Sequence, residues 1–267
     1  MIRTIVVGAA GRMGGTVIRT IQEAEGIEVV GAVERSDHPF LNRDIGEVTG
    51  LGEIGVPLVG DLERAIEVGE VVIDFTNPGA ALRSLEVSAR RSVAAVIGTT
   101  GFTPQQMDKV GELAKKTRCV LSPNMSVGVN LMFKLVGEIA SILGEEYDVE
   151  ILETHHRFKK DSPSGTAMKL GEIAASALSR DFHQVGVFGR KGVIGERKPQ
   201  EIGMQVMRAG DVVGEHTVIF GGLGERLELT HRAHSRDNFA RGAVRAVRWV
   251  ITQPNGLYDM GDVLGLK

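Results

Sequence analysis

Short runs of β-branched residues alternate with helix-like segments through the first half of the chain, and this alternation constrains the fold more than any other feature. The apolar runs include TIVVG at 4–8, IEVVGAVE at 27–34 and EVVIDFTNP at 70–78. Segments with apolar residues at helical spacing separate them, as at 11–24. Strands that alternate with helices form a parallel sheet covered on both faces, and ligands bind beyond the carboxyl ends of its strands. We therefore predict an N-terminal α/β domain with a parallel sheet that helices cover on both faces.

The pattern changes at about residue 126. A long apolar helix is predicted at 126–144, a strand at 147–156 and a further helix at 164–179, and three strand candidates follow at 202–210, 214–222 and 225–234. Neighbouring strands joined by short glycine-bearing turns favour antiparallel pairing. A last helix is predicted at 237–254, before a short tail. We predict two domains, one formed by 1–126 with 237–267 and the other, of the α+β type, by 127–236.

Composition excludes several classes of function. The net charge of -3 gives no electrostatic case for binding nucleic acid or an anionic membrane surface. Cys119 is the only cysteine, which excludes an internal disulfide and a cysteine-built zinc site. The chain opens without a signal-peptide pattern, and no apolar run is expected to approach the roughly 20 residues that span a bilayer. We expect a cytoplasmic protein.

The first glycine loop predicts a dinucleotide site. Gly8, Gly11 and Gly14 directly follow the first strand and begin the first helix, in the spacing G-x-x-G-x-x-G. Glycine permits a tight turn and lets main-chain N–H groups approach a pyrophosphate at the helix N-terminus. Glu34 ends the second strand and suits the free ribose hydroxyls of NAD, whereas Arg35 could meet the 2′-phosphate of NADP. The two residues together predict the use of both cofactors, although a solvated surface arginine explains Arg35 equally well.

Two later loops also end strands of this domain. GTTGF at 98–102 and SPNMSVG at 122–128 lie where such loops line the nicotinamide half of a dinucleotide site. Each loop taken alone is typical of an ordinary turn.

The segment ETHHRFKKDSPSGTA, at 153–167, concentrates ionisable groups. In a strand, His155 and His156 point to opposite faces and cannot play the same role. Ser162 is the predicted N-cap of the following helix, which leaves the N–H groups of Gly165 and Thr166 facing outward as a carboxylate or phosphate site. Lys159 and Lys160 add positive charge, and an imidazole titrates near neutrality. The segment predicts a small anionic substrate held where a proton can be delivered. No carboxylate lies near the histidines at metal-motif spacing, so no metal is predicted.

The chain resembles the 4-hydroxy-tetrahydrodipicolinate reductase (dihydrodipicolinate reductase) family of diaminopimelate and lysine biosynthesis. GAAGRMG, GTTGF, ETHHRFKKDSPSGTA, SVGVN and the final NGLYDMGDVLGL carry the resemblance, which covers nearly the whole chain. It implies an oxidoreductase that transfers hydride from NADH or NADPH to a cyclic imine dicarboxylate, giving tetrahydrodipicolinate and water. It also implies an N-terminal Rossmann-type domain with a doubly wound parallel sheet. The C-terminal domain is then an α+β substrate-binding domain with a mixed sheet, through which a homotetramer forms.

The resemblance also implies roles for individual residues. The implied proton donors are His155 and Lys159. The implied substrate contacts are His156, Gly165, Thr166 and Arg236. The implied cofactor contacts are Gly8, Ala9, Ala10, Gly11, Arg12, Met13, Glu34, Gly98, Thr99, Thr100, Ser122, Pro123, Asn124 and Met125. Two positions depart from the family pattern: Met125 stands where an aromatic residue is frequent, and Phe158 occupies a variable position without an assigned role.

Two other classes of function remain as alternatives. An amino-acid, sugar or semialdehyde dehydrogenase has the same architecture, but the semialdehyde type needs a thiol nucleophile and Cys119 lies in an apolar run. A dinucleotide-sensing regulator needs a partner surface or a basic DNA-binding helix, and it leaves the histidine and lysine residues unexplained. Oxidation of NADH on addition of the cyclic imine would distinguish these alternatives.

Overall fold

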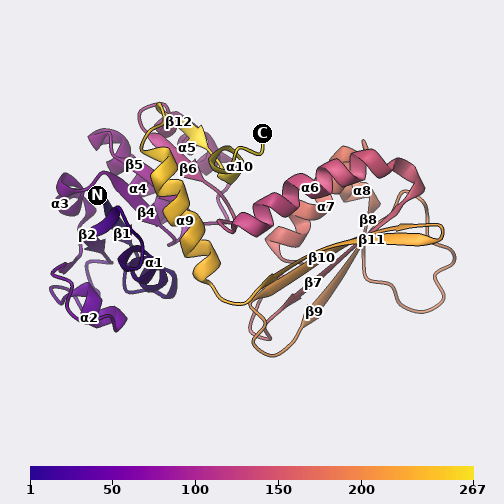
Figure 1. Cartoon of the computed structure of the whole chain (residues 1–267), viewed down its shortest axis with the longest axis horizontal. Coiled ribbons are helices and arrows are strands. Elements are labelled where there is room, and N and C mark those ends of the chain that lie inside the picture. Colours follow the sequence, from indigo (N-terminus) through magenta and orange to yellow (C-terminus); the bar gives the residue numbers. More distant parts are fainter. The chain divides into compact units, whose positions relative to one another are not determined.

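The computed structural model describes residues 1–267. Its helices and strands form two compact units, Met1–Val127 with Arg236–Lys267 and Gly128–Ser235 (Figure 1). Each unit has its own sheet and its own buried apolar residues.

A parallel sheet of seven strands forms the first unit, in the order β12-β6-β5-β4-β1-β2-β3. The strands are β1 Ile2–Val7, β2 Ile27–Val33, β3 Leu58–Val59, β4 Val71–Asp74, β5 Ala94–Ile97, β6 Arg118–Leu121 and β12 Gly256–Tyr258. The helices are α1 Arg12–Gln22, α2 Ile45–Thr49, α3 Leu62–Ala65 with the 3-10 turn η1 Ile66–Val68, α4 Pro78–Arg91, α5 Pro104–Ala114, α9 Asp237–Val250 and α10 Met260–Leu264. The predicted doubly wound parallel sheet is confirmed.

Helices cover both faces of this sheet. Alternate residues of β5 divide between two apolar clusters: Ala94 and Val96 pack in the cluster that contains residues of α1 and α9, whereas Ala95 and Ile97 pack with residues of α4 and α5. Burial on both faces explains why these strands read as continuous apolar runs. The strand order reverses beside β1, which has β2 on one side and β4 on the other, so the loops that follow β1 and β4 border the expected ligand crevice.

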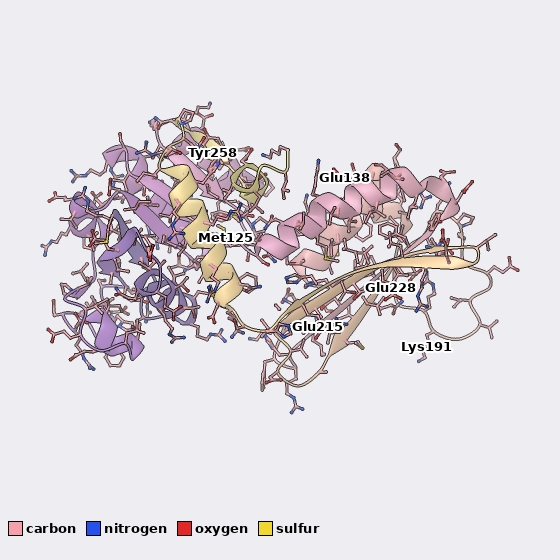
Figure 2. The ribbon with its side chains drawn as sticks, in the orientation of Figure 1. Met125, Glu138, Lys191, Glu215, Glu228 and Tyr258 are labelled. Atoms are coloured by element: carbon pink, nitrogen blue, oxygen red, sulfur yellow. The ribbon has the colours of Figure 1, made fainter.

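The C-terminal segment is part of the first sheet and not a mere tail. Strand β12 pairs in parallel with β6, and α10 follows it. The ring of Tyr258, which is labelled in Figure 2, meets the ring of Trp249 edge-on at a centroid distance of 5.0 Å. Short apolar segments such as GLY at 256–258 give too weak a periodic signal to be recognised as strands from sequence.

A mixed sheet of five strands forms the second unit, in the order β11-β10-β7-β9-β8. The strands are β7 Asp148–His155, β8 Gly186–Phe188, β9 Ile202–Arg208, β10 Gly214–Gly222 and β11 Glu225–Ala233, and the helices are α6 Val127–Leu143 with the 3-10 turn η2 Gly144–Glu146, α7 Gly165–Ala177 and α8 Phe182–Val185. Strands β10 and β11 pair antiparallel as predicted, but β9 pairs in parallel with β7. The expectation that β9 would pair with β10 is wrong, because β7 inserts between them.

Helices α6 and α7 contribute to the apolar core of the second unit, together with β7, β9 and β10. The expectation that no apolar run approaches membrane-spanning length is wrong, because the helical segment Val127–Glu146 has 20 residues and a mean hydropathy of 1.5. One such helix is weak evidence for a membrane span, since the core helix of a soluble protein can meet the same test of length and composition. Met132, Val136 and Ala140 of α6 are buried in this core, and Lys134 and Glu138 form an ion pair along the helix.

Candidate active site

The loop between β1 and α1 has the geometry of a phosphate-binding turn. Gly8 has a φ of +70°, which favours glycine, and its N–H donates to the carbonyl of Val33 at 2.9 Å. A Cβ at Gly14 would lie 2.1 Å from the carbonyl oxygen of Gly8, so only glycine permits this close approach of helix and loop. Gly11 is the N-cap of α1 and has no side chain to accept from the first N–H groups, and the first turn has no acidic residue. These features fit a pyrophosphate at the positive end of the helix.

The other residues predicted in this loop differ in exposure. Ala9 is fully buried and its N–H donates to the carbonyl of Val33 at 3.2 Å, whereas Ala10 and Met13 are half-buried. Arg12 begins α1 and is exposed. Ala9 therefore packs the turn, and the exposed part of the loop lies nearer to Gly11 and Arg12.

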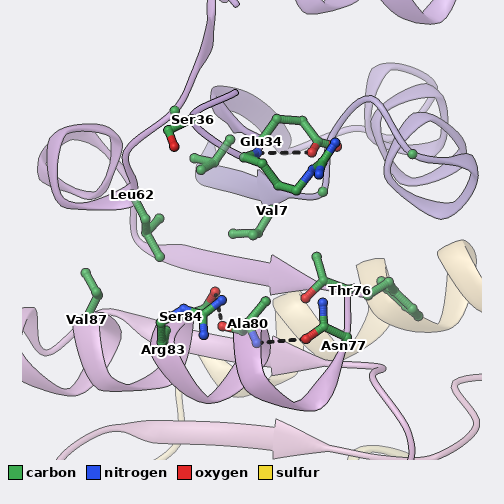
Figure 3. Close-up of a pocket in the computed structure, with 16 residues that line it drawn as sticks. Val7, Glu34, Ser36, Leu62, Thr76, Asn77, Ala80, Arg83, Ser84 and Val87 are labelled. Atoms are coloured by element: carbon green, nitrogen blue, oxygen red, sulfur yellow. Dashed lines mark hydrogen bonds between the residues drawn. The ribbon is translucent and has the colours of Figure 1, made fainter. Parts of the chain in front are cut away.

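A pocket of about 630 Å³ lies next to the glycine loop, which is within the usual range for small-molecule sites. It is lined by Val7, Gly8, Gly11, Val33, Glu34, Arg35, Ser36, Gly60, Leu62, Phe75, Thr76, Asn77, Ala80, Arg83, Ser84 and Val87. Glu34 and Ser36 lie on one side, and the residues of α4 lie on the other (Figure 3). Glu34 follows β2, where an acid can accept from ribose hydroxyls.

Two arginines line this pocket, and sequence reasoning identified only one. Arg35 is exposed and lies 3.7 Å from Asp37, so its ion pair is weak. Arg83 of α4 was missed because its spacing on the helix resembles that of an ordinary solvated residue. Two cationic side chains therefore line this pocket.

Asp74, at the end of β4, is a buried carboxylate that connects three segments of this unit. Its Oδ1 accepts from the N–H and hydroxyl of Thr76, at 2.8 and 2.6 Å, and from the hydroxyl of Thr99 at 3.3 Å. Its Oδ2 accepts from the hydroxyl of Ser84 at 2.7 Å. Burial raises the pKa of Asp74, and the hydrogen bonds from Thr76, Ser84 and Thr99 offset this effect only in part.

The GTTGF loop is fixed against β4. Gly98 donates to the carbonyl of Asp74 at 2.9 Å, and a Cβ at Gly98 would lie 2.1 Å from the ring of Phe75. Thr99 is buried through its bond to Asp74, whereas Thr100 is exposed. Thr100 is therefore the more accessible of the two threonines.

The segment that follows β6 is held by its own hydrogen bonds. The hydroxyl of Ser122 donates to the carbonyl of Asn124 at 2.9 Å, and the Asn124 side chain accepts from the N–H of Ser126 at 2.9 Å. Pro123 is exposed. The side chain of Met125, which is labelled in Figure 2, is 1% exposed and packs in the apolar core with residues of α9. A role for Met125 at the cofactor stays a prediction.

In the second unit, Glu153 and His155 lie at the carboxyl end of β7. Two residues apart on a strand, they point to the same face. Glu153 is fully buried and accepts from Nδ1 of His155 at 2.5 Å, from the main-chain N–H of Ser164 at 2.9 Å and from both terminal nitrogens of Arg208 at 3.0 Å. Burial alone would raise the pKa of Glu153, but the hydrogen bonds from His155, Arg208 and Ser164 lower it to about 2.

The loop after β7 carries Lys159. Its Nζ donates to both carboxylate oxygens of Asp161, at 2.9 and 2.8 Å, and the carbonyl of Asp161 accepts from Arg208 at 2.8 Å. An unbroken series of hydrogen bonds therefore connects His155 to Lys159 through Glu153, Arg208 and Asp161. Lys160 is exposed.

The expected N-cap of α7 is wrong by two residues. Ser164, and not Ser162, caps the helix by accepting from the N–H of Ala167 at 3.2 Å, and the helix begins at Gly165. Ser164 has the extended backbone that an N-cap requires, with φ -66° and ψ 151°, whereas Pro163 lies outside the helix. Gly165 is exposed, and a Cβ there would meet no atom within 4 Å, so open space adjoins this end of the helix.

The remaining predicted substrate contacts belong to different elements. His156 is half-buried, and its ring lies 6.3 Å from that of Phe158. Thr166 is half-buried in the first turn of α7. Arg236 is the residue before α9 and belongs to the first unit.

His216 is a further ionisable residue that sequence reasoning missed. It pairs with Glu153 in the register of β10 and β7, and its ring meets that of His155 edge-on at 5.2 Å. Burial and the nearby His155 lower the pKa of His216 to about 3, so it is neutral at physiological pH. The two-residue spacing of Glu153 and His155 was a usable sequence signal, but Arg208 and His216 reach the site only through strand register.

Comparisons with known proteins cover the whole chain. The family model described as "Dihydrodipicolinate reductase, N-terminus" matches residues 2–125, and "Dihydrodipicolinate reductase, C-terminus" matches residues 128–264. Proteins named 4-hydroxy-tetrahydrodipicolinate reductase from Syntrophus aciditrophicus (strain SB) and Geotalea uraniireducens (strain Rf4) are 54% and 55% identical, each over 100% of both chains.

Solved structures share the fold. The dipicolinate-bound dihydrodipicolinate reductase from Paenisporosarcina sp. TG-14 has a TM-score of 0.77 and 27% identity, over 97% of each chain. A myo-inositol dehydrogenase from Corynebacterium glutamicum ATCC 13032 has a TM-score of 0.60 over 100% of this chain and 93% of its own, but only 12% identity, and so shares the fold alone.

Proposed function

The chain belongs to the dihydrodipicolinate reductase family, and on that premise we propose that His155 and Lys159 supply the proton in its reaction. The protein is an NAD(P)H-dependent oxidoreductase, a 4-hydroxy-tetrahydrodipicolinate reductase of diaminopimelate and lysine biosynthesis. The sequence-based predictions of family, enzyme class and cofactors are confirmed.

The residues of the first unit fit a dinucleotide. Main-chain N–H groups at the start of α1 would hold the pyrophosphate, Glu34 would accept from the adenosine ribose, and Arg35 would meet a 2′-phosphate. The glycine positions support this assignment, because a side chain at Gly14 would fill the turn. The bound cofactor supplies a hydride, and the protein orients and polarises the substrate.

The proton chemistry is assigned to the second unit. The substrate is a cyclic imine with two carboxylates, and loss of its 4-hydroxyl group as water leaves a conjugated imine. When hydride adds at C4, electron density moves towards the ring nitrogen, and the resulting enamine needs a proton. Lys159 and His155 would stabilise the developing negative charge and deliver that proton.

The substrate carboxylates are assigned to the start of α7 and its surroundings. The N–H groups of Gly165 and Thr166 lie at the positive end of the helix, beside open space. We assign His156 and Arg236 to the same role on the basis of the family resemblance. The neighbour from Paenisporosarcina was solved with dipicolinate, a dicarboxylate of similar shape, which supports this class of ligand.

One observation carries the assignment of the proton donors. The hydrogen-bonded series from His155 through Glu153, Arg208 and Asp161 to Lys159 fixes two proton-bearing groups from different segments. Fixed geometry of this kind lets a side chain deliver a proton in the transition state.

Single substitutions test these roles by steady-state kinetics with NADH and the freshly generated imine. Lys159→Ala and His155→Ala should each lower kcat by about 10²-fold or more, because a lost proton donor acts on the transition state. His156→Ala and Thr166→Val should instead raise KM for the imine, with a smaller change in kcat. All four should bind NADH like the parent. Full kcat in Lys159→Ala, or loss of NADH binding in all four, would contradict the assignment.

Assembly and location complete the proposal. The family comprises soluble biosynthetic enzymes, and we place this member in the cytoplasm as a homotetramer formed through residues 127–236. Strand β11 is an edge strand with Leu227 46% exposed, and Leu223 in the preceding turn is fully exposed, so a closed assembly would cover them. Light scattering that gives the mass of a monomer at micromolar concentration would contradict this part.

A further inference from the structure

We infer that Glu153 and Arg208 are positioning residues for the reaction, which fix the reacting nitrogen of His155 and the loop that carries Lys159. The inference rests on the role proposed for His155. Neither residue needs to touch the substrate, because both act through the side chains that they hold. Their contacts, their burial and their distribution over β7 and β9 lead to this assignment.

Glu153 fixes the tautomer of His155. Its Oε2 accepts from Nδ1 of His155 and from Arg208, while Oε1 accepts from Arg208 and from the N–H of Ser164. An ionised carboxylate can only accept, so Nδ1 of His155 must carry the proton in this bond. Nε2 is then the nitrogen that gains and loses a proton during the reaction.

The surroundings of Nε2 suit this role. Gly214 of β10 faces His155, and a Cβ at that position would lie 3.0 Å from Nε2. The glycine therefore leaves room beside this nitrogen. His216 packs on the ring of His155 but is neutral, so it constrains the ring without competing for Glu153 as a cation.

Arg208 connects the carboxylate to the second proton donor. One of its terminal nitrogens donates both to Glu153 at 3.0 Å and to the carbonyl of Asp161 at 2.8 Å. The side chain of Asp161 in turn holds Nζ of Lys159. Loss of Arg208 would therefore remove the countercharge of Glu153 and release the loop.

Five ionisable groups either adjoin His155 or belong to the hydrogen-bonded series that starts from it, and they set the sign of any electrostatic change. They are Glu153 on β7, Arg208 on β9, His216 on β10, and Lys159 and Asp161 in the loop after β7. Removal of a negative charge from this set makes an imidazolium less favourable, and removal of a positive charge makes it more favourable.

The test is the dependence of kcat on pH, measured with NADH for the parent, Glu153→Gln and Arg208→Gln. Both variants should lower kcat at least about 10-fold, a part of the 10²- to 10⁴-fold that a positioned proton donor contributes. The alkaline limb, where the donor loses its proton, should move to lower pH in Glu153→Gln and to higher pH in Arg208→Gln, by about one unit each. If the two residues had only a structural role, kcat would fall by the same factor at every pH and the alkaline limb would not move.

Glu150→Gln is a matched control on the same strand. Glu150 accepts from both terminal nitrogens of Arg190 at 2.9 Å, but it does not contact His155. This variant loses the ion pairs of Glu150 with Arg190 and Arg197 and should keep the limb of the parent. Glu153→Asp keeps the charge, so it should keep the position of the limb while kcat falls. Because Glu153→Asp retains the buried charge, its kcat can still be measured if Glu153→Gln fails to fold.

The outcomes separate this inference from the proposed function. If His155→Ala keeps the kcat of the parent, the role proposed for His155 is wrong. Suppose that His155→Ala loses kcat, but the alkaline limbs of Glu153→Gln and Arg208→Gln both stay where the parent has its limb. Then only the positioning role is wrong. Should Glu153→Gln not fold, an unmoved limb in Arg208→Gln alone overturns the inference. Limbs that move in opposite directions support it.

Discussion

Each unit of the protein buries one carboxylate, and the two are stabilised in different ways. Asp74 in the first unit is surrounded by three hydroxyl groups and a main-chain N–H, all of them neutral. Glu153 in the second unit is bound by Arg208, by His155 and by a main-chain N–H. Their pKa values move in opposite directions, upward for Asp74 and downward to about 2 for Glu153.

The difference shows that burial alone does not decide the charge of a group. Desolvation raises the pKa of both carboxyls, and it is reversed only at Glu153, where His155, Arg208 and the N–H of Ser164 donate hydrogen bonds. The same contrast applies to ligands. The first unit presents main-chain N–H groups and a glycine turn to an anion, whereas the second presents lysine, histidine and a helix start. The positive end of a helix favours a bound anion, and fixed donors and cations stabilise charge that develops in a reaction step.

Glu153→Gln should have the largest effect on stability. The substitution leaves Arg208 without its charged partner in a largely buried site, which costs about 3 kcal/mol in the free energy of unfolding at pH 7. Urea denaturation at fixed protein concentration measures this loss. The control Glu150→Gln removes ion pairs with Arg190 and Arg197, but the side chain of Glu150 is about a quarter exposed, so its loss should be smaller. Equal losses in the two variants would show that burial of Glu153 adds nothing to the contribution of its ion pair to stability.

Low pH should lower the free energy of unfolding of the parent by protonating Glu153. Because the pKa of Glu153 falls from 4.5 unfolded to about 2 folded, its contribution is present above about pH 4.5 and is lost as the pH falls towards 2. The linkage amounts to about 3 kcal/mol over that window. Chemical denaturation at several pH values should show this slope in the parent and a reduced slope in Glu153→Gln. The same slope in both would exclude Glu153 as its source.

Asp74→Asn should have a smaller effect, with the opposite dependence on pH. A raised pKa means that folding is opposed as the pH rises through the range where Asp74 ionises. The amide removes this penalty, and its NH₂ group can donate to Ser84, whose hydroxyl can turn to the carbonyl of Ala80 at 3.1 Å. We expect a change below about 1 kcal/mol at pH 7. A loss as large as that of Glu153→Gln would contradict the contrast between the two carboxylates.

The smallest expected effect concerns cofactor choice. Arg35→Ala should weaken binding of NADPH a few-fold and binding of NADH less, since only NADPH carries a 2′-phosphate and an exposed ion pair contributes about 1 kcal/mol or less. Arg83→Ala is the companion variant on the other side of the pocket (Figure 3). Fluorescence titration with both cofactors measures the ratio. Equal losses for the two cofactors would show that the substituted arginine does not bind the phosphate.

Sequence periodicity predicted the first unit better than the second. The strands of a two-sided parallel sheet are continuous apolar runs, so β1, β2, β4, β5 and β6 were all recognised. The short β12 lacks such a run, and its pairing with β6 depends on the preceding helix α9, which returns the chain to the first unit. In the second unit the four longer strands were found, but the three-residue β8 was missed. One pairing was also wrong, because β9 joins β7 although β10 follows it in sequence.

By itself, the sequence determined the alternating architecture, the glycine turn and the proton-bearing segment at 153–167, since local spacing encodes each of them. Tertiary structure alone decided which groups surround His155. Arg208 and His216 lie 53 and 61 residues further along the chain and reach it through the register of β9 and β10. It also decided the opposite pKa shifts of the two buried carboxyls, because neither the desolvation of a group nor its hydrogen-bond partners can be read from neighbouring residues in sequence.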